Sequence, residues 1–534
     1  MHPAVSAARK SAPAASPAAR PIRRVLIANR GEIAVRIARA CRELGIESIA
    51  VYSDADVGAP HVRAADQAVH IGPAPAAQSY LRGDHLIEVA KAHGADAIHP
   101  GYGFLSEREW FARAVREAGL IWIGPPAEAI AAMGSKTAAR TLAIAAGTPV
   151  VPGTTEALRD ATQAAELAAQ FGYPVLLKAA AGGGGKGMRV VRAPGEIASA
   201  LESAKREAQN AFGDDAVYIE KYIEGPRHVE IQILADAHGT CVAVGERECS
   251  IQRRHQKMIE EAPSVAVSPE LRKRMGDAAV AAAKAAGYVN AGTCEFLLDA
   301  HGDFYFLEMN TRIQVEHPVT ELVTGLDLVQ WQLRIASGEP LPFTQTPEPR
   351  GWAIECRITS EDPAHGFLPS TGRITALHLP SGPGIRWDGG IEVGTTVGLS
   401  YDPMLAKLIV HAPTREAAIA RMRRALQELV IEGVETSCEF HLRMMDDPEY
   451  QRSAVDIQWL EAKLPELLGA APPEETIRAA AVGAVLLAER DREGRVRQVA
   501  NGGARTSMGA AGSDAPNELR GWSRLAREES LRRR

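Results

Sequence analysis

The chain has 534 residues, of which 46% are hydrophobic and 24% charged, a composition typical of a globular protein with roughly two to four domains. Its formal net charge of −6 lacks the basic excess of nucleic-acid-binding proteins, and no apolar run reaches the roughly 18 residues that span a membrane, so neither nucleic acid nor a membrane is an expected partner. Its six cysteines form no C-x-x-C pair, which favours a reducing, cytoplasmic location and argues against a zinc site.

The first segment, residues 1–21, combines Ala, Pro and Ser with a few basic residues and no acid. This composition predicts a disordered arm, with an organelle transit peptide as the alternative. The segment has no apolar core, so a secretory signal is not expected.

Short apolar runs and amphipathic segments then alternate. The pattern predicts strands at 25–28, 46–52, 97–98 and 120–123, and helices at 32–44, 84–93 and 106–118. Parallel strands that alternate with helices indicate a doubly wound α/β domain, which we place at 22–134. The glycine turn at 29–32 departs from the dinucleotide-binding fingerprint, so NAD is not an expected ligand.

A helical connector at 135–146 leads into a small domain at about 151–222 that carries a run of four glycines. These are Gly182, Gly183, Gly184 and Gly185. Their backbone N–H groups can close on phosphate oxygens without interference from Cβ atoms, and Lys178 and Lys186 bracket them. A strand follows the run, and no Ser or Thr completes a Gly-Lys pair, so neither a Rossmann turn nor a P-loop fits. The run predicts a lid over a triphosphate, with a plain linker as the alternative.

Two further strands are predicted at 293–298 and 304–309, joined by a loop that contains Gly302. If the loop is 300–303, Glu295 lies opposite Glu308. Like charges that face each other across a strand pair are unfavourable unless a cation lies between them. Since Mg²⁺ is typically held by one or two carboxylates plus substrate phosphates, the pair predicts a metal–nucleotide site.

Polar and mostly apolar side chains alternate in the next stretch. The polar set is Glu308, Asn310, Arg312, Gln314 and Glu316; the intervening set is Leu307, Met309, Thr311, Ile313 and Val315. In an extended chain the polar set shares one face and the other set can face a core. Two carboxylates, two amides and a guanidinium suit metal ions and small oxyanions, while a solvated strand face is the alternative.

Together these segments closely resemble the biotin carboxylases of the ATP-grasp superfamily, from about residue 22 to 468. The resemblance rests on the glycine run and on 27–33, 98–106, 225–232, 246–257, 308–318 and 355–358. It implies a fold of mixed α/β and α+β class, with a doubly wound pre-ATP-grasp domain, an ATP-grasp domain at 135–345 and a mixed C-terminal biotin carboxylase domain at 346–468. The resemblance says nothing about the tail at 469–534, whose basic end is either solvated or a docking helix.

Enzymes of this family use ATP to activate bicarbonate as carboxyphosphate and then carboxylate biotin. The resemblance implies specific residues for the nucleotide and its metal. The phosphates would contact Lys136, Lys178 and Gly182–Gly185; adenine would contact Glu220, Tyr222 and Ile223; His228, Gln252 and His255 belong to the same site; and Mg²⁺ or Mn²⁺ would be held by Glu295, Glu308 and Asn310.

The resemblance also implies residues for the two chemical steps. Bicarbonate would be held by Lys257, Arg312, Gln314 and the Val315 backbone, with Glu316 as the base; biotin would meet Arg357 and Tyr102. Arg357 would stabilise the biotin enolate. From local sequence alone, a salt bridge to a neighbouring acid is the alternative role for this arginine.

The sequence contains no Ala-Met-Lys-Met biotin-attachment motif and no segment that suggests a carboxyltransferase. We therefore expect a biotin carboxylase subunit that forms a homodimer and works with a separate biotin carboxyl carrier protein and carboxyltransferase subunits. Acetyl-CoA carboxylase of fatty-acid synthesis is the favoured holoenzyme, with propionyl-CoA or pyruvate carboxylase as alternatives. Two rivals stay open: another ATP-grasp ligase that joins a carboxylate to an amine, and a non-catalytic nucleotide-binding scaffold.

Overall fold

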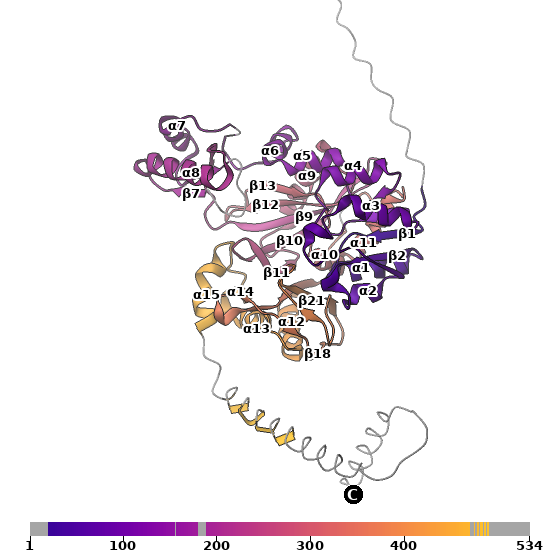
Figure 1. The fold of residues 1–534 in the computed structure, drawn as a ribbon. Coiled ribbons are helices and arrows are strands. Elements are labelled where there is room, and N and C mark those ends of the chain that lie inside the picture. Colours follow the sequence, from indigo (N-terminus) through magenta and orange to yellow (C-terminus); the bar gives the residue numbers. More distant parts are fainter. Residues whose placement is uncertain are drawn as a thin grey trace, which may run out of the picture. The chain divides into compact units, whose positions relative to one another are not determined.

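A computed structural model describes residues 20–154, 156–179, 188–345 and 347–469, with scattered residues between 475 and 490. The predicted arm and the glycine run lie outside these residues, as does most of the tail. The chain divides into two units, Met1–Leu468 and Gly469–Arg534, and the first unit carries the elements labelled in Figure 1. Within the described ranges, no helix is both long enough and apolar enough to cross a bilayer.

The first part of the chain forms a five-stranded parallel sheet in the order β3-β2-β1-β4-β5. The strands are β1 (Arg24–Ile27), β2 (Glu47–Tyr52), β3 (Gln67–His70), β4 (Ala97–His99) and β5 (Ile121–Trp122), and the helices are α1 (Gly31–Glu43), α2 (Pro60–Ala64), α3 (Gly83–Ala92), α4 (Glu109–Glu117) and α5 (Ala127–Gly134). This arrangement confirms the doubly wound prediction. The sequence analysis missed β3, an edge strand whose mostly exposed side chains give no apolar alternation.

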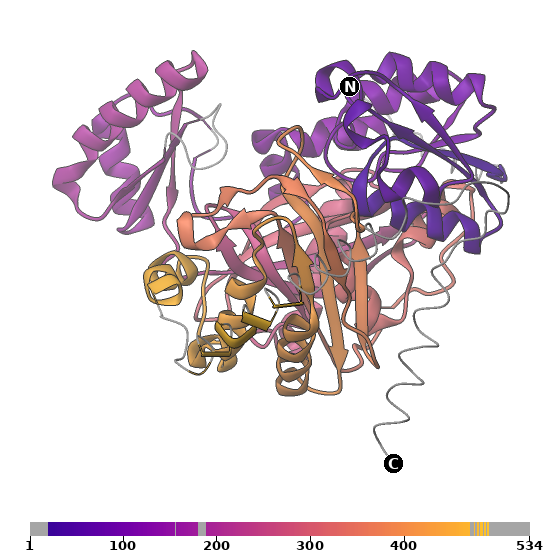
Figure 2. The same ribbon diagram turned by 60° about the horizontal axis from the view of Figure 1, so that its bottom comes forward.

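Helix α6 (Lys136–Ala145) leads to a small layer of three antiparallel strands in the order β7-β6-β8. The strands are β6 (Val175–Ala179), β7 (Met188–Val191) and β8 (Val217–Lys221), and the helices are α7 (Ala161–Phe171) and α8 (Ile197–Phe212). Alternate strand residues such as Val175 and Leu177 pack against both helices, which leaves Lys178 on the other face. Figure 2 shows this layer set off from the rest of the unit.

An antiparallel sheet of eight strands, in the order β13-β12-β9-β10-β11-β14-β21-β19, forms the body. Its strands are β9 (Arg227–Ala235), β10 (Cys241–Arg253), β11 (Gln256–Ala262), β12 (Asn290–Leu298), β13 (Phe304–Asn310), β14 (Trp352–Thr359), β19 (Ile385–Gly389) and β21 (Met404–Ala412). The strands from β9 to β13 belong to the predicted ATP-grasp region, and the last three belong to the predicted C-terminal region. One sheet therefore joins the two regions through the β11–β14 pairing.

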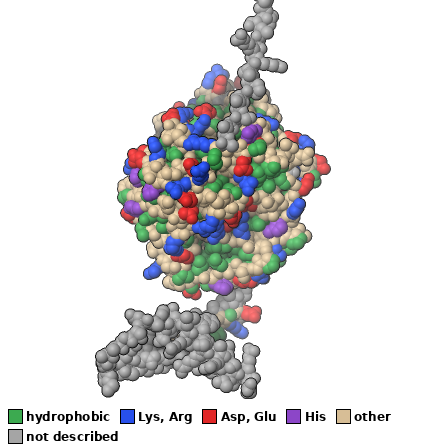
Figure 3. Space-filling view, turned by 90° about the vertical axis from the view of Figure 1, so that its right-hand side faces the viewer, with side chains coloured by type: hydrophobic (Ala, Val, Ile, Leu, Met, Phe, Trp, Pro, Cys, Tyr) green, Lys and Arg blue, Asp and Glu red, His purple; other side chains and the backbone are tan. Residues whose placement is uncertain are grey.

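Helices cover both faces of this sheet, and short strand pairs lie at its C-terminal end. The helices are α9 (Pro269–Ala285), α10 (His317–Thr324), α11 (Leu328–Ala336), α12 (Arg415–Glu428), α13 (Cys438–Asp446), α14 (Pro448–Gln451) and α15 (Trp459–Gly469). The short strands are β15 (Glu361–Asp362), β16 (Leu368–Pro369), β17 (Gly372–Arg373), β18 (Ala376–His378), β20 (Thr396–Val397) and β22 (Val430–Glu432). On the face of the molecule drawn in Figure 3, acidic and basic side chains are interspersed.

The predicted pairing of Glu295 with Glu308 is confirmed, although the loop length and the strand register differ from those predicted. Leu298 pairs with Phe304, so the loop has five residues, and a bulge at Leu307 restores the expected register. The bulge also corrects the prediction for Leu307, which was expected to face the core but is 39% exposed.

The predicted extended stretch from residue 308 to 316 is wrong in its second half. Strand β13 ends at Asn310, and the chain then turns until α10 starts at His317 with Pro318 in its first turn. Ile313 is nevertheless buried, and the polar side chains still converge, because the turn folds them back over the sheet.

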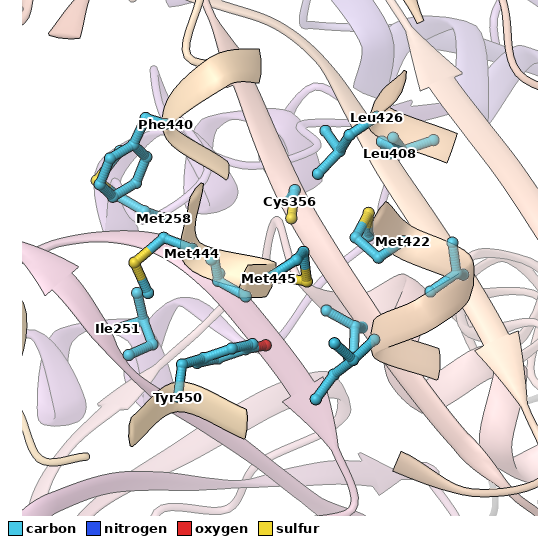
Figure 4. Close-up of a cluster of buried hydrophobic side chains, with 14 of the residues drawn as sticks. Ile251, Met258, Cys356, Leu408, Met422, Leu426, Phe440, Met444, Met445 and Tyr450 are labelled. Atoms are coloured by element: carbon cyan, nitrogen blue, oxygen red, sulfur yellow. The ribbon is translucent and has the colours of Figure 1, made fainter. Parts of the chain in front are cut away.

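The C-terminal core packs α12, α13 and α14 against β14 and β21 (Figure 4). Met445, Cys356 and Tyr450 meet there, and Phe440 packs edge-on against Phe367 with ring centroids 5.4 Å apart. Such close packing means that truncation of one ring leaves a cavity.

We expect Phe440→Ala to lower the free energy of unfolding by about 3–5 kcal/mol, because the substitution loses buried apolar area and opens a cavity. The denaturant midpoint of the purified protein measures the effect. The control is Val393→Ala at a side chain that is 57% exposed, with an expected change below about 0.5 kcal/mol. Equal midpoints for the two variants would contradict the prediction.

Candidate functional site

The candidate site centres on the ammonium group of Lys257 on β11. Its Nζ donates to Glu230 over 2.6 Å, to Glu295 over 2.9 Å and to Glu316 over 2.7 Å. Burial alone lowers the pKa of Lys257, but the three carboxylates around it raise that pKa well above its ordinary value. The lysine therefore stays charged and draws together side chains from β9, β12 and the start of α10.

Glu316 lies at the N-terminal end of α10 and is fully buried. One oxygen accepts from Lys257, and the other accepts from the Arg357 guanidinium over 3.0 Å. Burial raises the pKa of this carboxyl group, yet the two cations outweigh burial and hold the pKa well below its usual range. Glu316 is thus an ionised acceptor in a dry position.

Glu295 carries the densest set of contacts. Its Oε1 accepts from Asn310 over 2.7 Å and from Gln314 over 3.0 Å, and its Oε2 lies 3.1 Å from His228 Nε2. Glu308 is its partner across β12 and β13. Two carboxylates on adjacent strands offer hard oxygen donors, and a divalent cation such as Mg²⁺ would relieve their repulsion, so the residues fit the predicted metal.

Arg312 projects between the turn after β13 and the N-terminal domain. Its guanidinium donates to Gln314 Oε1 and Asn310 Oδ1, each over 3.2 Å, and its Nε lies 3.1 Å from Glu107. The Val315 carbonyl accepts from Lys407 Nζ over 2.8 Å. The structure therefore brings together the predicted anion-holding residues.

Arg357 meets acids on two sides. Its Nε donates to Glu260 over 2.6 Å and its terminal nitrogen donates to Glu316, so the salt-bridge alternative is confirmed as a geometric fact. A narrow cavity of about 40 Å³ lies beside it, lined by Arg253, Gln256, Lys257, Met258, Thr359, Glu361 and Phe367 as well. The other predicted biotin residue, Tyr102, donates to Glu32, which is 3.2 Å from Lys407. The arginine can thus serve both as a structural ion pair and as a cation beside a small cavity.

The predicted nucleotide residues lie around this cluster at different depths. Glu220 at the end of β8 bonds to Lys178 and accepts from Arg140 over 3.2 Å, while Tyr222 and Ile223 follow, half-buried. Gln252 is buried in β10. In contrast, His255 is exposed in the β10–β11 turn, with φ of 66°. Lys136 begins α6, and Gly182–Gly185 lie outside the described residues.

Sequence reasoning missed five side chains that hold the site together. They are Glu107, Glu230, Arg247, Glu260 and Lys407, each in contact with a predicted residue or its neighbour. Arg247 is fully buried and donates to Glu230, to Gln232 over 2.7 Å and to Thr320 over 3.0 Å. The alternation of Glu230 and Gln232 with apolar residues in β9 was the available signal.

We expect Arg247→Met to destabilise the protein by about 3–5 kcal/mol, because it leaves the buried Glu230 with one cation instead of two. Chemical denaturation gives the midpoint. The matched control is Arg424→Met on α12, whose exposed ion pair with Glu428 is worth less than about 1 kcal/mol. A midpoint for Arg247→Met as high as that of the control would contradict the prediction.

Comparison with known families places three models along the chain. "Biotin carboxylase, N-terminal domain" matches residues 21–130, "Carbamoyl-phosphate synthase L chain, ATP binding domain" matches 135–344, and "Biotin carboxylase C-terminal domain" matches 355–462. Biotin carboxylase 1 of Bacillus subtilis is 52% identical over 442 residues, which cover 82% of this chain and 98% of that protein. A pyruvate carboxylase subunit from Methanothermobacter thermautotrophicus is 52% identical over 439 residues, with coverage of 82% and 89%.

A solved structure shows the same architecture. The biotin carboxylase domain dimer of Hydrogenobacter thermophilus 2-oxoglutarate carboxylase, crystallised with MgADP, ADP and bicarbonate, is 46% identical. It aligns with a TM-score of 0.78 over 84% of this chain and 99% of that one. The likeness therefore extends over most of this chain and nearly all of the neighbour's domain.

Proposed function

Because the chain belongs to the biotin carboxylase family, we propose that it is an ATP-dependent ligase that carboxylates biotin with bicarbonate and forms ADP. The biotin would be presented by a carrier outside these 534 residues. The observation that carries the proposal is the convergence of Lys257, Glu316 and Arg357 by direct hydrogen bonds. This group combines an anion-binding cation, an ionised base and a second cation beside a cavity.

The nucleotide step requires alignment and charge neutralisation. Lys178 faces away from the helices of the small layer and can reach a phosphate, while its present partner is Glu220. Glu295 and Glu308 would hold Mg²⁺, which when bound supplies charge neutralisation for the phosphates.

The bicarbonate step needs cations for the anion and a base for its proton. Arg312 presents a planar fork that matches a carbonate edge, and Glu107 on the N-terminal domain fixes its Nε end. Lys257 would share its ammonium between Glu316 and the incoming anion. Glu316 is ionised before the reaction, so it can accept the bicarbonate proton and leave a nucleophile for the γ-phosphate.

The biotin step needs a cation where negative charge develops on the ureido oxygen. Arg357 supplies it from the wall of the cavity. When Glu316 accepts a proton, it ceases to be a counter-ion for this guanidinium. The first step thereby increases the positive charge that Arg357 presents to the second.

We expect the purified protein to hydrolyse ATP with Mg²⁺ only when bicarbonate is present, and faster when free biotin is added. Glu316→Gln should lower the bicarbonate-dependent rate by about 10²–10⁴-fold, because the base is lost, while binding of ATP persists. A coupled ADP assay measures the rate, with Glu428→Gln, which alters an exposed ion pair on α12, as the control. If the Glu316 variant turned over within tenfold of the wild-type rate, Glu316 would not be the base that deprotonates bicarbonate.

We expect Arg357→Ala to lose biotin-stimulated turnover by about 10²–10³-fold while it keeps the slow bicarbonate-dependent ATP hydrolysis, since its cation meets the biotin oxyanion in the second step, whereas Lys257 remains as a counter-ion for Glu316 in the first. The control is Arg424→Ala, on the same domain but in an exposed pair. Equal loss of both rates would count against the assignment to biotin. Stimulation by an amine in place of biotin would favour the alternative of a carbamoyl-phosphate-like ligase. The family that matches residues 135–344 is named for carbamoyl-phosphate synthase, which is why this alternative is tested.

For the wider role, we propose a homodimeric subunit of an acetyl-CoA carboxylase for fatty-acid synthesis, in the cytoplasm. Relatives at 52% identity carry the names biotin carboxylase and pyruvate carboxylase, so similarity alone favours neither acceptor. The acceptor is chosen by the carboxyltransferase. Pyruvate and propionyl-CoA carboxylases therefore stand as the alternatives, and assays with the isolated partner subunits separate them.

A further inference from the structure

Two glutamates lie side by side beneath Arg357 in the eight-stranded sheet. Glu260 on β11 and Glu355 on β14 are directly paired across the two strands, and both are fully buried. Paired residues have Cβ atoms about 4.5–5.5 Å apart, so the two carboxyl groups are neighbours. Arg357 follows Glu355 by two residues, projects from the same face of β14 and bonds to Glu260.

Three of the four carboxyl oxygens of this pair receive no hydrogen bond from the described residues: Glu260 Oε2 and both oxygens of Glu355. A buried ionised carboxylate without donors is strongly unfavourable, and two facing carboxylates repel each other. A single proton removes both costs, because a protonated carboxyl group can donate to the free oxygen of its neighbour.

Charged and titratable groups approach the pair from every element that packs against it. The cations are Arg357 on β14, Lys407 on β21 and Lys257 on β11; the others are Glu316 at the start of α10 and the thiols of Cys249 on β10 and Cys356 on β14. Neither of the two nearest cations gives all its hydrogen bonds to the pair. Arg357 divides its bonds between Glu260 and Glu316, and Lys407 bonds to the Val315 carbonyl.

We propose that Glu260 and Glu355 share one proton, and that this shared proton limits the pair to one negative charge, so that Arg357 is balanced rather than outweighed by its carboxylate partners when the biotin oxyanion forms. The inference rests on the function proposed above. Burial raises the pKa of Glu260 to about 7 and raises the pKa of Glu355 well above its ordinary value. Both shifts agree with a pair that carries a single negative charge at neutral pH.

The shared proton sets the charge that Arg357 can offer. When the pair holds the shared proton, the guanidinium of Arg357 faces two negative charges, one on the pair and one on Glu316. When Glu316 accepts the bicarbonate proton, only the charge on the pair remains. If Glu355 were also ionised, two negative charges would face one guanidinium, and the group would carry a net negative charge that repels the biotin oxyanion. Glu355 is therefore a positioning residue that acts through Arg357.

Glu355→Gln tests the proposal, because an amide keeps the shape and the donor of a protonated carboxyl group but cannot ionise. The biotin-stimulated rate should stay within about tenfold of wild type at pH 7. Above pH 7 the wild-type rate should fall as the pair loses its proton, and the fall should move upward by about one pH unit or more in the variant. Profiles of identical shape would overturn the proposal.

Glu248→Gln is the matched control. Glu248 is also fully buried with a raised pKa, mainly from burial, but it accepts from Ser250 and, over 2.6 Å, from Ser264. It makes no bond to Arg357, so its variant should keep the wild-type profile of the biotin-stimulated rate. A shifted profile in this control as well would show that burial of any carboxyl group suffices, and would overturn the specific role of the pair.

A stability measurement tests the shared proton without activity. A carboxyl group whose pKa is raised on folding contributes stability at low pH that is lost as pH rises through the folded pKa. The melting temperature of Glu355→Gln relative to wild type should therefore rise between about pH 5 and pH 9. A constant difference would overturn the proposal, whereas absence of biotin stimulation in wild type at every pH would refute the proposed function instead.

If Glu355→Gln does not fold, infrared spectroscopy of the Glu248→Gln protein replaces it. At pH 8, exposed carboxyl groups are ionised, while Glu32 is also buried with a raised pKa, so the C=O band of a protonated carboxyl group that belongs to the Glu260–Glu355 pair is the part of the signal that Glu260→Gln removes. Its disappearance toward higher pH supports the shared proton. No such band at pH 8 would overturn the proposal.

Discussion

The burial of one ammonium group among three carboxylates constrains the rest of the structure. Lys257 can be charged in a dry site only if Glu230, Glu295 and Glu316 all reach it, and each of those carboxylates needs the lysine for the same reason. These residues come from three strands and a helix start. The packing of the sheet and the position of α10 are therefore fixed together with the charge arrangement of the site.

The site depends on all three regions of the first unit. The N-terminal domain contributes Glu107 to Arg312 and Glu32 to Lys407, and the C-terminal strands contribute Arg357. A buried ion pair between Arg36 on α1 and Glu321 on α10, 2.9 Å long, ties the N-terminal domain to the helix that carries the base. Because these contacts are charged and buried, a shift of one domain would leave unpaired charges in the centre.

Much of this arrangement follows from local sequence, and the rest does not. The pairing of Glu295 with Glu308 was predictable because a hairpin is local, although a five-residue loop and a bulge compensate for each other. The turn after Asn310 was not predictable from the sequence. Alternation of polar and apolar residues looks the same in a strand and in a turn that folds polar groups over a sheet. Glu230 and Glu260 were not predicted for another reason. Their strands, β9 and β11, pair with β12 and β14, which lie tens of residues away along the chain.

The position of Glu316 explains how one side chain can connect two chemical steps. It stands at the N-terminal end of α10, where the helix dipole favours a negative charge, and it bonds to cations on two sides. Each of these three influences weakens its basicity, so it accepts a proton only from a group held against it. Once protonated, it weakens its bonds to both Lys257 and Arg357. A proton transfer to the oxygen of Glu316 that faces Lys257 thus also changes the charge at the oxygen that faces Arg357. The bicarbonate step can therefore influence Arg357 beside the cavity without any movement of the fold.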